Sequence, residues 1–506
     1  MKKLFFICCA VWLNGQESYP VDWEVVAKIR EEGFQRSEIA NTFSYMTDVL
    51  GARLTNSEDM RRAQDWAVKE MKRIGLTNID VEPFMDYGVS WDNTFFSLHM
   101  IEPDYQTMVG YPIAHTPGIN GRQKLNVVRT DINVIADLDQ YKGKLRGKAV
   151  LASPQVVINQ NRYRDGVQRY TDEQLEEIAN RALPKPSRRP RGPVNPDLVS
   201  AEERNAFFKS EGVSVILESR SGWIAAVRGF ARPGAKKDKW DRKGTLNHLP
   251  IVAVTPEHYN RMVRITERDI PVKIDIEIQT KIGRNRQEAR NVLGEIEGID
   301  LKNEVVMLGA HFDTWHASPN ASDNTSGVAV MLEAMRILKA VGAKPRRTIR
   351  IALWSGEEQG LHGSREYVNK HFGNPNDPNV GKKKGYDRFS AYFNQDYGPG
   401  QYRGIYLQDN EHVRQAFTSW IRPFKDLRMT TIASQSVGST DHIPFDRAGL
   451  PAFQFLQDRV GGTGGHTNLD FYDTIPIEDI KKNAVIVASF VYHTAMLGER
   501  LPRKGQ

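Results

Sequence analysis

From residue 291 onward, the sequence alternates between short apolar runs typical of buried strands and longer segments with helical spacing. Residues 305–308 form a continuous apolar run, 327–338 an amphipathic helix and 348–354 a second strand. Such a series predicts a right-handed parallel unit with helices packed on the sheet. Residues 390–393 and 452–456 are further strand candidates. The alternation predicts an α/β fold, a three-layer sandwich around a mixed, mainly parallel sheet.

The first third of the chain has a different character. Residues 38–50 and 57–74 carry apolar side chains at helical spacing, and Ser57 is a suitable N-cap for the second of these helices. Between about 120 and 285, short β-rich runs separated by polar loops predominate, which predicts an inserted β-rich domain. A polar helix is expected over 171–182, followed by a loop rich in proline and arginine. These β-rich runs are 149–152, 213–217 and 251–254.

The N-terminus has the order of a secretory signal over residues 1–16. Lys2 and Lys3 precede an apolar run over 4–13 and a polar end over 14–16. The run is too short for a membrane helix, which needs about 20 residues. We therefore expect a secreted or periplasmic protein with no integral membrane segment in its mature chain. Both cysteines, Cys8 and Cys9, lie in this segment, so the mature chain would have neither disulfides nor thiolate metal ligands.

Composition and charge exclude little. Hydrophobic residues make up 40% of the chain, which is ordinary for a globular protein and argues against disorder. The net charge of +7 is concentrated in runs such as 185–192 and 236–243, which are typical of solvated loops. We expect no nucleic-acid partner. The sequence does not fix the oligomeric state and leaves a homodimer open.

Polar residues able to bind a metal follow the ends of successive predicted strands. Open α/β sheets place their ligand crevice at this edge. Taken singly, each residue has an ordinary structural explanation, such as a turn residue or a solvated acidic pair. Their joint placement favours a functional site. The residues are His311 and Asp313 after the first strand, Asp323 before the helix, Glu357 and Glu358 after the second strand, Asp396 after the third and His466 after the fourth.

This set of side chains predicts a catalytic metal centre. The two imidazoles and three of the carboxylates suit Zn²⁺, which binds nitrogen and oxygen donors at about 2.0–2.2 Å. Five protein ligands exceed what one catalytic zinc with an open position needs. They fit two ions about 3.5–4 Å apart that share a bridging carboxylate. The sequence therefore predicts two zinc ions per chain.

Four motifs carry a family resemblance over about residues 286–495. They resemble the co-catalytic zinc exopeptidases that include bacterial aminopeptidases and plasma glutamate carboxypeptidase. The β-rich insertion resembles the protease-associated domain that these enzymes often carry. The resemblance implies an N-terminal part of the peptidase domain over 17–120, the insertion over 121–285 and the catalytic domain over 286–506. The motifs are Gly309-Ala-His-Phe-Asp-Thr314, Ala321-Ser-Asp-Asn324 with Gly327-Val328, Trp354-Ser-Gly-Glu-Glu-Gln-Gly-Leu-His-Gly-Ser364 and Gly465-His466.

The resemblance also implies roles for individual residues. His311 and Asp396 would bind one zinc, Glu358 and His466 the other, and Asp323 would bridge the two. Glu357 would be the general base that takes a proton from the attacking water and passes it to the leaving amine. Asp313 would hold the far nitrogen of His311 and raise the basicity of that ligand. Family members also have a cis peptide bond at the position of Asp323-Asn324.

A loop over residues 438–445 resembles the segment that closes over the substrate in this family. Asp441 and His442 in it are candidates for steadying the oxyanion or binding a substrate terminus, and a plain turn capped by Asp441 is an equally good interpretation. His316 stands where some relatives have an acidic residue, which leaves the specificity pocket open.

The favoured function is hydrolysis of the terminal peptide bond of short peptides by an aminopeptidase or a dipeptidase. A carboxypeptidase is the main alternative, because the sequence does not show which terminus is recognised. A glutaminyl cyclase has the same type of fold but generally one zinc, and is disfavoured because both His311 and Asp396 are present. An inactive binding homologue would be expected to have lost a ligand or the base, and none is missing.

Overall fold

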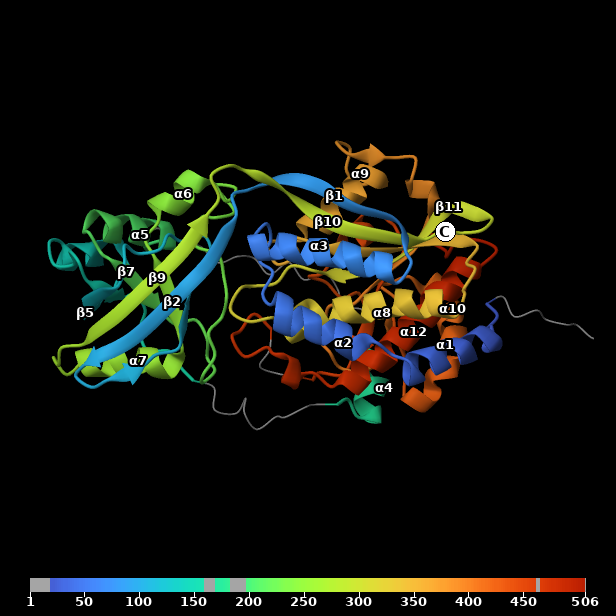
Figure 1. Cartoon of the computed structure of the whole chain (residues 1–506), viewed down its shortest axis with the longest axis horizontal. Helices are drawn as coiled ribbons and strands as arrows, with labels where there is room; N and C mark the ends of the chain where they lie inside the picture. The colour runs from blue at the N-terminus through green and yellow to red at the C-terminus, as the bar shows by residue number, and fades with distance from the viewer. Residues whose placement is uncertain (1–18, 159–168, 183–196, 461–464, 506) are drawn as a thin grey trace, which may run out of the picture.

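We describe a computed structural model of the chain for residues 19–158, 169–182, 197–460 and 465–505. The signal segment, both cysteines and the loop rich in proline and arginine lie outside these ranges. The described residues form two large sheets, each with its own helices (Figure 1). Within those residues, no helix is both long enough and apolar enough to span a membrane.

The first sheet carries the predicted strand series. Its strands β11, β12, β15 and β18 run parallel to one another, whereas β1 and β10 join one edge in antiparallel fashion. The sheet is therefore mixed, as expected. The strand order is β1 (Thr77–Gly88), β10 (Gln287–Ile296), β12 (Arg347–Trp354), β11 (Leu301–His311), β15 (Phe389–Asn394), β18 (Ala452–Gln457), β16 (Tyr402–Tyr406) and β17 (Thr431–Ala433).

Helices cover both faces of this sheet. Along β11, Val306, Leu308 and Ala310 enter one apolar core, while Val305 and Met307 enter another on the opposite face. Successive side chains of a strand point to opposite faces, so this continuous apolar run is buried on both sides. One face packs against α1 (Trp23–Gln35), α2 (Ile39–Ser44), α3 (Glu58–Arg73), α8 (Ser326–Ala340), α10 (Arg414–Trp420) and α12 (Ile477–Met496), and the other against α9 (His362–His371) and α11 (His442–Arg447).

The N-terminal helices largely follow the predicted ranges. The Ser57 side chain accepts a hydrogen bond from the Met60 backbone, so Ser57 is the N-cap of α3. The helix expected over 38–50 is instead α2 followed by a π-helical segment, Tyr45–Leu50, that ends at Gly51. Gly51 has a φ of 70°, a conformation that most side chains avoid, and it stops the helix there.

The second sheet is an insertion between two neighbouring strands of the first. The chain leaves the first sheet after β1 and returns to it at β10, which pairs with β1. Figure 1 shows the resulting lobe beside the main body. The strand order is β3 (Gln106–Thr107), β2 (Trp91–Glu102), β9 (Lys273–Ile282), β5 (Gln123–Arg129), β6 (Ala149–Leu151), β7 (Val215–Glu218), β8 (Ile251–Val254) and β4 (Gly110–Pro112).

This sheet begins before residue 121, the expected start of the insertion. Strands β2, β3 and β4 all belong to it, whereas its last strand, β9, ends close to the expected boundary at 285. Strand β2 lacks a clean alternation of buried and exposed positions, so its sequence carries a weak strand signal. Helices α5 (Ala201–Ser210), α6 (Arg242–Asn247) and α7 (Pro256–Thr266) accompany this sheet.

The polar helix of the insertion reaches back to the first sheet. Helix α4 (Asp172–Asn180) begins after Thr171, whose side chain caps it as a box with Gln174. Its buried Leu175 and Ile178 pack against Ala433 and Leu456 of strands β17 and β18. The insertion therefore contacts the main body away from the two strands that connect them.

Candidate metal centre and active site

Two ligand residues project from the ends of adjacent parallel strands. His311 is the last residue of β11, and Asp396 follows β15, which pairs with β11. The His311 Nε2 lies 3.0 Å from an Asp396 carboxylate oxygen and 3.2 Å from Asp323 Oδ1. Asp323 lies in the turn Ala321–Thr325 that leads into α8, where its own backbone angles are non-helical, and the peptide bond Asp323-Asn324 is cis, as the resemblance implied. These three side chains form the first triad.

A second triad shares Asp323 with the first. The His466 Nε2 lies 2.8 Å from Glu358 Oε2 and 3.1 Å from Asp323 Oδ2. The two oxygens of Asp323 therefore face different histidines. Glu358 follows β12, and His466 lies on the loop after β18. In each triad, the candidate ligand atoms lie within 4.8 Å of one another.

The donor set and its spacing fit zinc. Ligand atoms about 2.0–2.1 Å from one tetrahedral ion lie about 3.3 Å apart, close to the spacings found here. Glu358 Oε1 is buried and has no hydrogen-bond partner among the described atoms, as an oxygen reserved for a metal would. Nitrogen and carboxylate oxygen donors are those that zinc accepts. The residues present therefore fit two ions joined by the Asp323 carboxylate.

Asp313 contacts its neighbours differently from the expectation. The far nitrogen of His311, Nδ1, hydrogen-bonds to the backbone carbonyl of Asp313 at 2.8 Å, whereas the carboxylate lies 3.9 Å away. The carboxylate instead accepts from the backbone nitrogens of Glu357 and Glu358, at 3.2 and 3.3 Å, and from the Thr55 hydroxyl at 2.9 Å. Asp313 thus fixes His311 through its main chain and the loop of the two glutamates through its side chain.

Electrostatics at the site reflect several buried carboxylates close together. Burial raises the pKa of Glu357 well above its usual value; His311 opposes this, and Asp396 and Asp441 add to it. Burial likewise raises the pKa of Glu358 to about 7. Two cations placed between these groups would relieve this cost, because a nearby positive charge favours the ionised form of a carboxylate.

The pKa values of Asp323 and His466 are shifted in the direction that favours the charged form of each side chain. Burial would raise the pKa of Asp323, but hydrogen bonds from His311 and His466 outweigh it and lower that pKa. Burial lowers the pKa of His466, yet its hydrogen bonds to Asp323 and Glu358 raise it to about 10. A metal ion bound at these atoms would take the place of the proton on each histidine.

The two candidate substrate residues are placed differently. Asp441 is fully buried, and burial raises its pKa to about 8, with Asp396 and Asp313 close enough to add to the shift. Its Oδ1 accepts from Ser364, and its Oδ2 has no partner among the described atoms. The His442 Nε2 is instead tied to the Val437 carbonyl at 3.0 Å. The His316 Nε2 is likewise held by a backbone carbonyl, that of Pro112, at 2.6 Å.

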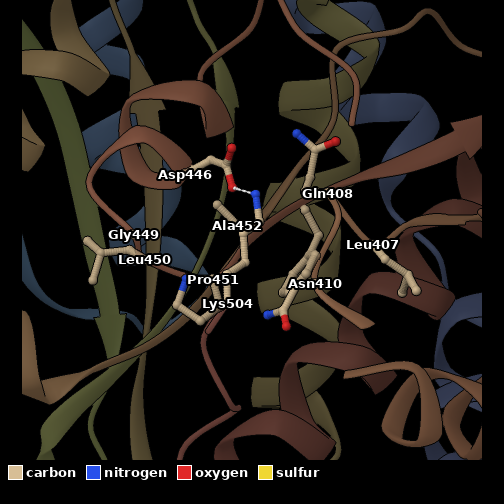
Figure 2. Close-up of a pocket in the computed structure, with 10 residues that line it drawn as sticks. Leu407, Gln408, Asn410, Asp446, Gly449, Leu450, Pro451, Ala452 and Lys504 are labelled. Carbon is tan, nitrogen blue, oxygen red and sulfur yellow. Dashed lines mark hydrogen bonds and ion pairs between the residues drawn. The ribbon is translucent and has the colours of Figure 1, made fainter. Parts of the chain in front are cut away.

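The cavity shown in Figure 2 is not the substrate site. Its volume is about 10 Å³, roughly the room that one water molecule requires. Asp446 and Lys504 form an ion pair beside it (Figure 2). Neither triad contributes a residue to its wall, which also includes Leu407, Gln408, Asn410, Gly449, Leu450, Pro451, Ala452 and Phe453.

Two residues that support the site, Thr55 and Arg53, belong to no motif in the sequence. Thr55 reaches Asp313 from the segment between the first helices, and Arg53, fully buried, donates to the Phe312 carbonyl at 2.8 Å. Both stand in a polar break, residues 51–57, between two helical patterns. A polar break that interrupts strong helical patterns is the one signal that could have drawn attention to them.

The similarity to known proteins defines a zinc metallopeptidase of the exopeptidase class. Residues 291–491 match the model of Peptidase family M28, which confirms the resemblance noted in the motifs. The chain is homologous to carboxypeptidase Q and to bacterial zinc aminopeptidases. It is accordingly a hydrolase.

The relatives differ in how much of the chain they cover. Carboxypeptidase Q from Homo sapiens is 22% identical over 96% of this chain and 89% of its own length. Aminopeptidase YwaD from Bacillus subtilis (strain 168) is 26% identical over 50% of this chain and 53% of its own length. A crystal structure of a peptidase M28 precursor from Shewanella amazonensis SB2B superposes with a TM-score of 0.65 at 20% identity, over 96% of this chain and 99% of that one. This structure shares the fold.

Proposed function

We propose that the protein is a dizinc exopeptidase that hydrolyses the terminal peptide bond of short peptides. The observation that carries this proposal is the pair of triads joined by Asp323, with Glu357 beside them. Two zinc ions held there would polarise a substrate carbonyl and lower the pKa of a water molecule. His311 and Asp396 would hold one ion, and Glu358 and His466 the other.

Glu357 is the proposed general base. Glu357 is half-buried, with its carboxylate close enough to His311 and Asp396 for both to shift its pKa, and the Asp313 carboxylate accepts from its backbone nitrogen. A raised pKa suits a group that must first take a proton from water and then release it to the leaving amine. Asp441, whose raised pKa favours the protonated carboxyl, is the proposed donor to the oxyanion. His442 would support that segment through Val437.

We favour an aminopeptidase or a dipeptidase that acts outside the cytoplasm, given the signal-like order of residues 1–16. Carboxypeptidase activity is the second candidate. It is favoured by one observation: relatives that align with 96% of the chain are named carboxypeptidase Q. The β-rich lobe is proposed to be a protease-associated domain, since it interrupts the peptidase fold between β1 and β10.

A panel of dipeptides with free and blocked termini tests the proposal. Chelator-sensitive cleavage that is lost on blocking the amino end would support an aminopeptidase, and loss on blocking the carboxyl end would support a carboxypeptidase. Loss with either block would support a dipeptidase. Cyclisation of N-terminal glutamine without peptide cleavage would favour the cyclase, and absence of any turnover would contradict the proposal.

A further inference from the structure

The insertion contacts the loop that carries His466. Its segment 225–229 runs beside residues 466–468, and an isolated β-bridge joins Arg228 to Thr467. The Gly229 backbone nitrogen donates to the His466 carbonyl at 2.8 Å. We call these two segments, 225–229 and 466–468, the clamp.

Asn468 makes most of the side-chain contacts of the clamp. Its Oδ1 accepts from the Val227 nitrogen at 2.6 Å, and its Nδ2 donates to the Ala225 carbonyl at 3.1 Å. Its own backbone nitrogen donates to the Val227 carbonyl at 3.1 Å. One asparagine therefore satisfies three backbone groups of the insertion, which fixes the two segments relative to each other.

His466 has a backbone conformation that requires such support. Its φ is 62°, in the left-handed region that residues with a Cβ rarely adopt. Residues in this conformation persist where surrounding contacts hold them. The clamp bonds the His466 carbonyl directly and the residue two positions on through its side chain. The direction of the His466 ring toward Asp323 and Glu358 depends on this backbone.

Gly229 of the clamp lies close to the segment that follows β11. A Cβ there would lie 3.0 Å from the Trp315 Cβ and 3.7 Å from the His316 nitrogen. Trp315 in turn packs edge-on against the His466 ring, with centroids 6.3 Å apart. The insertion, the segment after β11 and the ligand loop are therefore packed together at one corner of the metal centre.

We infer that the inserted lobe is part of the metal site: Asn468 is a positioning residue that keeps His466 in its ligand pose by anchoring the loop to the insertion. This inference rests on the proposed two-zinc function. It assigns the insertion a role in holding one particular ion, the one shared by Glu358, His466 and Asp323. Among the described residues, no hydrogen bond joins the insertion to His311, Asp323 or Asp396 of the first triad.

The main body also anchors the loop, so contacts other than the clamp contribute to its position. The Ser318 hydroxyl donates to the Thr467 carbonyl at 2.6 Å, and Asp470 accepts from Ser322. These contacts hold the loop at Thr467 and Asp470 from the main body. If they sufficed, loss of the Asn468 side chain would leave zinc binding unchanged, which makes the inference testable.

The test is zinc affinity in the full-length protein. Wild type, Asn468→Ala and the control Gln435→Ala are dialysed against a graded series of zinc buffers, and zinc per chain is measured. Gln435 is a matched control because its amide also donates to a backbone carbonyl of the insertion, that of Ile178 at 2.7 Å, but far along the chain from the ligand loop. Thermal unfolding of each variant shows whether it is folded. Asn468→Asp, which keeps the acceptor for Val227, carries the test if the alanine variant does not fold.

We expect Asn468→Ala to bind one zinc as wild type does and the other about 10- to 100-fold more weakly, the usual effect of losing a partner that orients a ligand. Gln435→Ala should match wild type. Two zincs with wild-type affinity in the folded Asn468 variant would overturn the inference and leave the proposed function intact. Fewer than two zincs in wild type at saturating metal would instead overturn the proposed function, and the inference with it.

Discussion

The two triads share Asp323 but are held in different ways. His311 and Asp396 follow neighbouring parallel strands, and their side chains are 1% and 8% exposed. The His466 side chain is 29% exposed and lies on a loop that bonds to the insertion. Sheet register places the first pair of ligands without help, because parallel strands end at one edge. A ligand on a loop needs partners from elsewhere, and here the inserted lobe provides them.

Glu357→Gln should have the largest effect, and it separates catalysis from both triads. Glutamine keeps the size of the side chain but cannot take a proton. We expect turnover to fall by about 10³-fold, with two zincs still bound. Steady-state kinetics with metal analysis on the same samples checks this. Full activity in the variant would remove Glu357 from the role of base, and loss of zinc would make it a ligand.

Asp313→Asn should have the next largest effect, since Asp313 contacts residues of both triads. An asparagine amide group turned toward the Glu357 and Glu358 nitrogens cannot accept from them as a carboxylate oxygen does. We expect kcat/KM to fall by about 10- to 100-fold. Thr55→Val, which removes the hydroxyl that donates to Asp313 and accepts from the Gly356 nitrogen, is the graded control and should cost less. Equal losses in both variants would contradict this account of Asp313.

The two triads should differ in how easily a chelator removes their zinc. The zinc left in a His311→Ala variant depends on the loop ligand, and the zinc left in His466→Ala depends on the strand ends. We expect a chelator to remove the zinc of the His311→Ala variant at about tenfold lower concentration than the zinc of the His466→Ala variant. Zinc per chain, measured over a chelator series, gives the answer. If the two remaining ions are equally resistant, the difference in how the triads are held has no energetic consequence.

One part of the pH dependence of stability should arise outside the triads, and it is the smallest of these effects. Burial lowers the pKa of His115 to about 3, from about 6.5 in an unfolded chain. The unfolded state therefore binds the proton first, and stability falls as the pH drops below about 6.5. This residue alone should cost about 1 kcal/mol between pH 7 and pH 5.5.

Denaturant unfolding of wild type and His115→Asn at these two pH values measures that loss as the difference between the two proteins, because the titrating carboxylates of the metal centre are common to both. His115→Asn suits the comparison because asparagine tolerates the left-handed φ of 60° at this position. The variant should show a shallower dependence on pH than wild type. An unchanged dependence would assign the acid sensitivity to other groups, such as the buried His316.

The sequence predicted the strands that end at the site more closely than it predicted the loops. The runs 305–308 and 348–354 lie within β11 and β12, and the residues after them meet as expected. It did less well with long-range loop contacts. Nothing in the order of residues places Asn468 beside Val227 or Thr55 beside Asp313, because both pairs depend on how separate segments fold together. The second sheet begins before residue 121, at β2, whose partly exposed residues lack a clear alternation.

The metal content of wild type and Asp323→Asn tests the central claim most directly. If one carboxylate bridges two zincs, wild type should bind two per chain, and the single substitution should weaken both sites together. This follows because the two oxygens of Asp323 face His311 and His466 separately. A variant that loses one zinc and keeps the other at full affinity, or a wild-type protein that saturates at one, would contradict the shared centre.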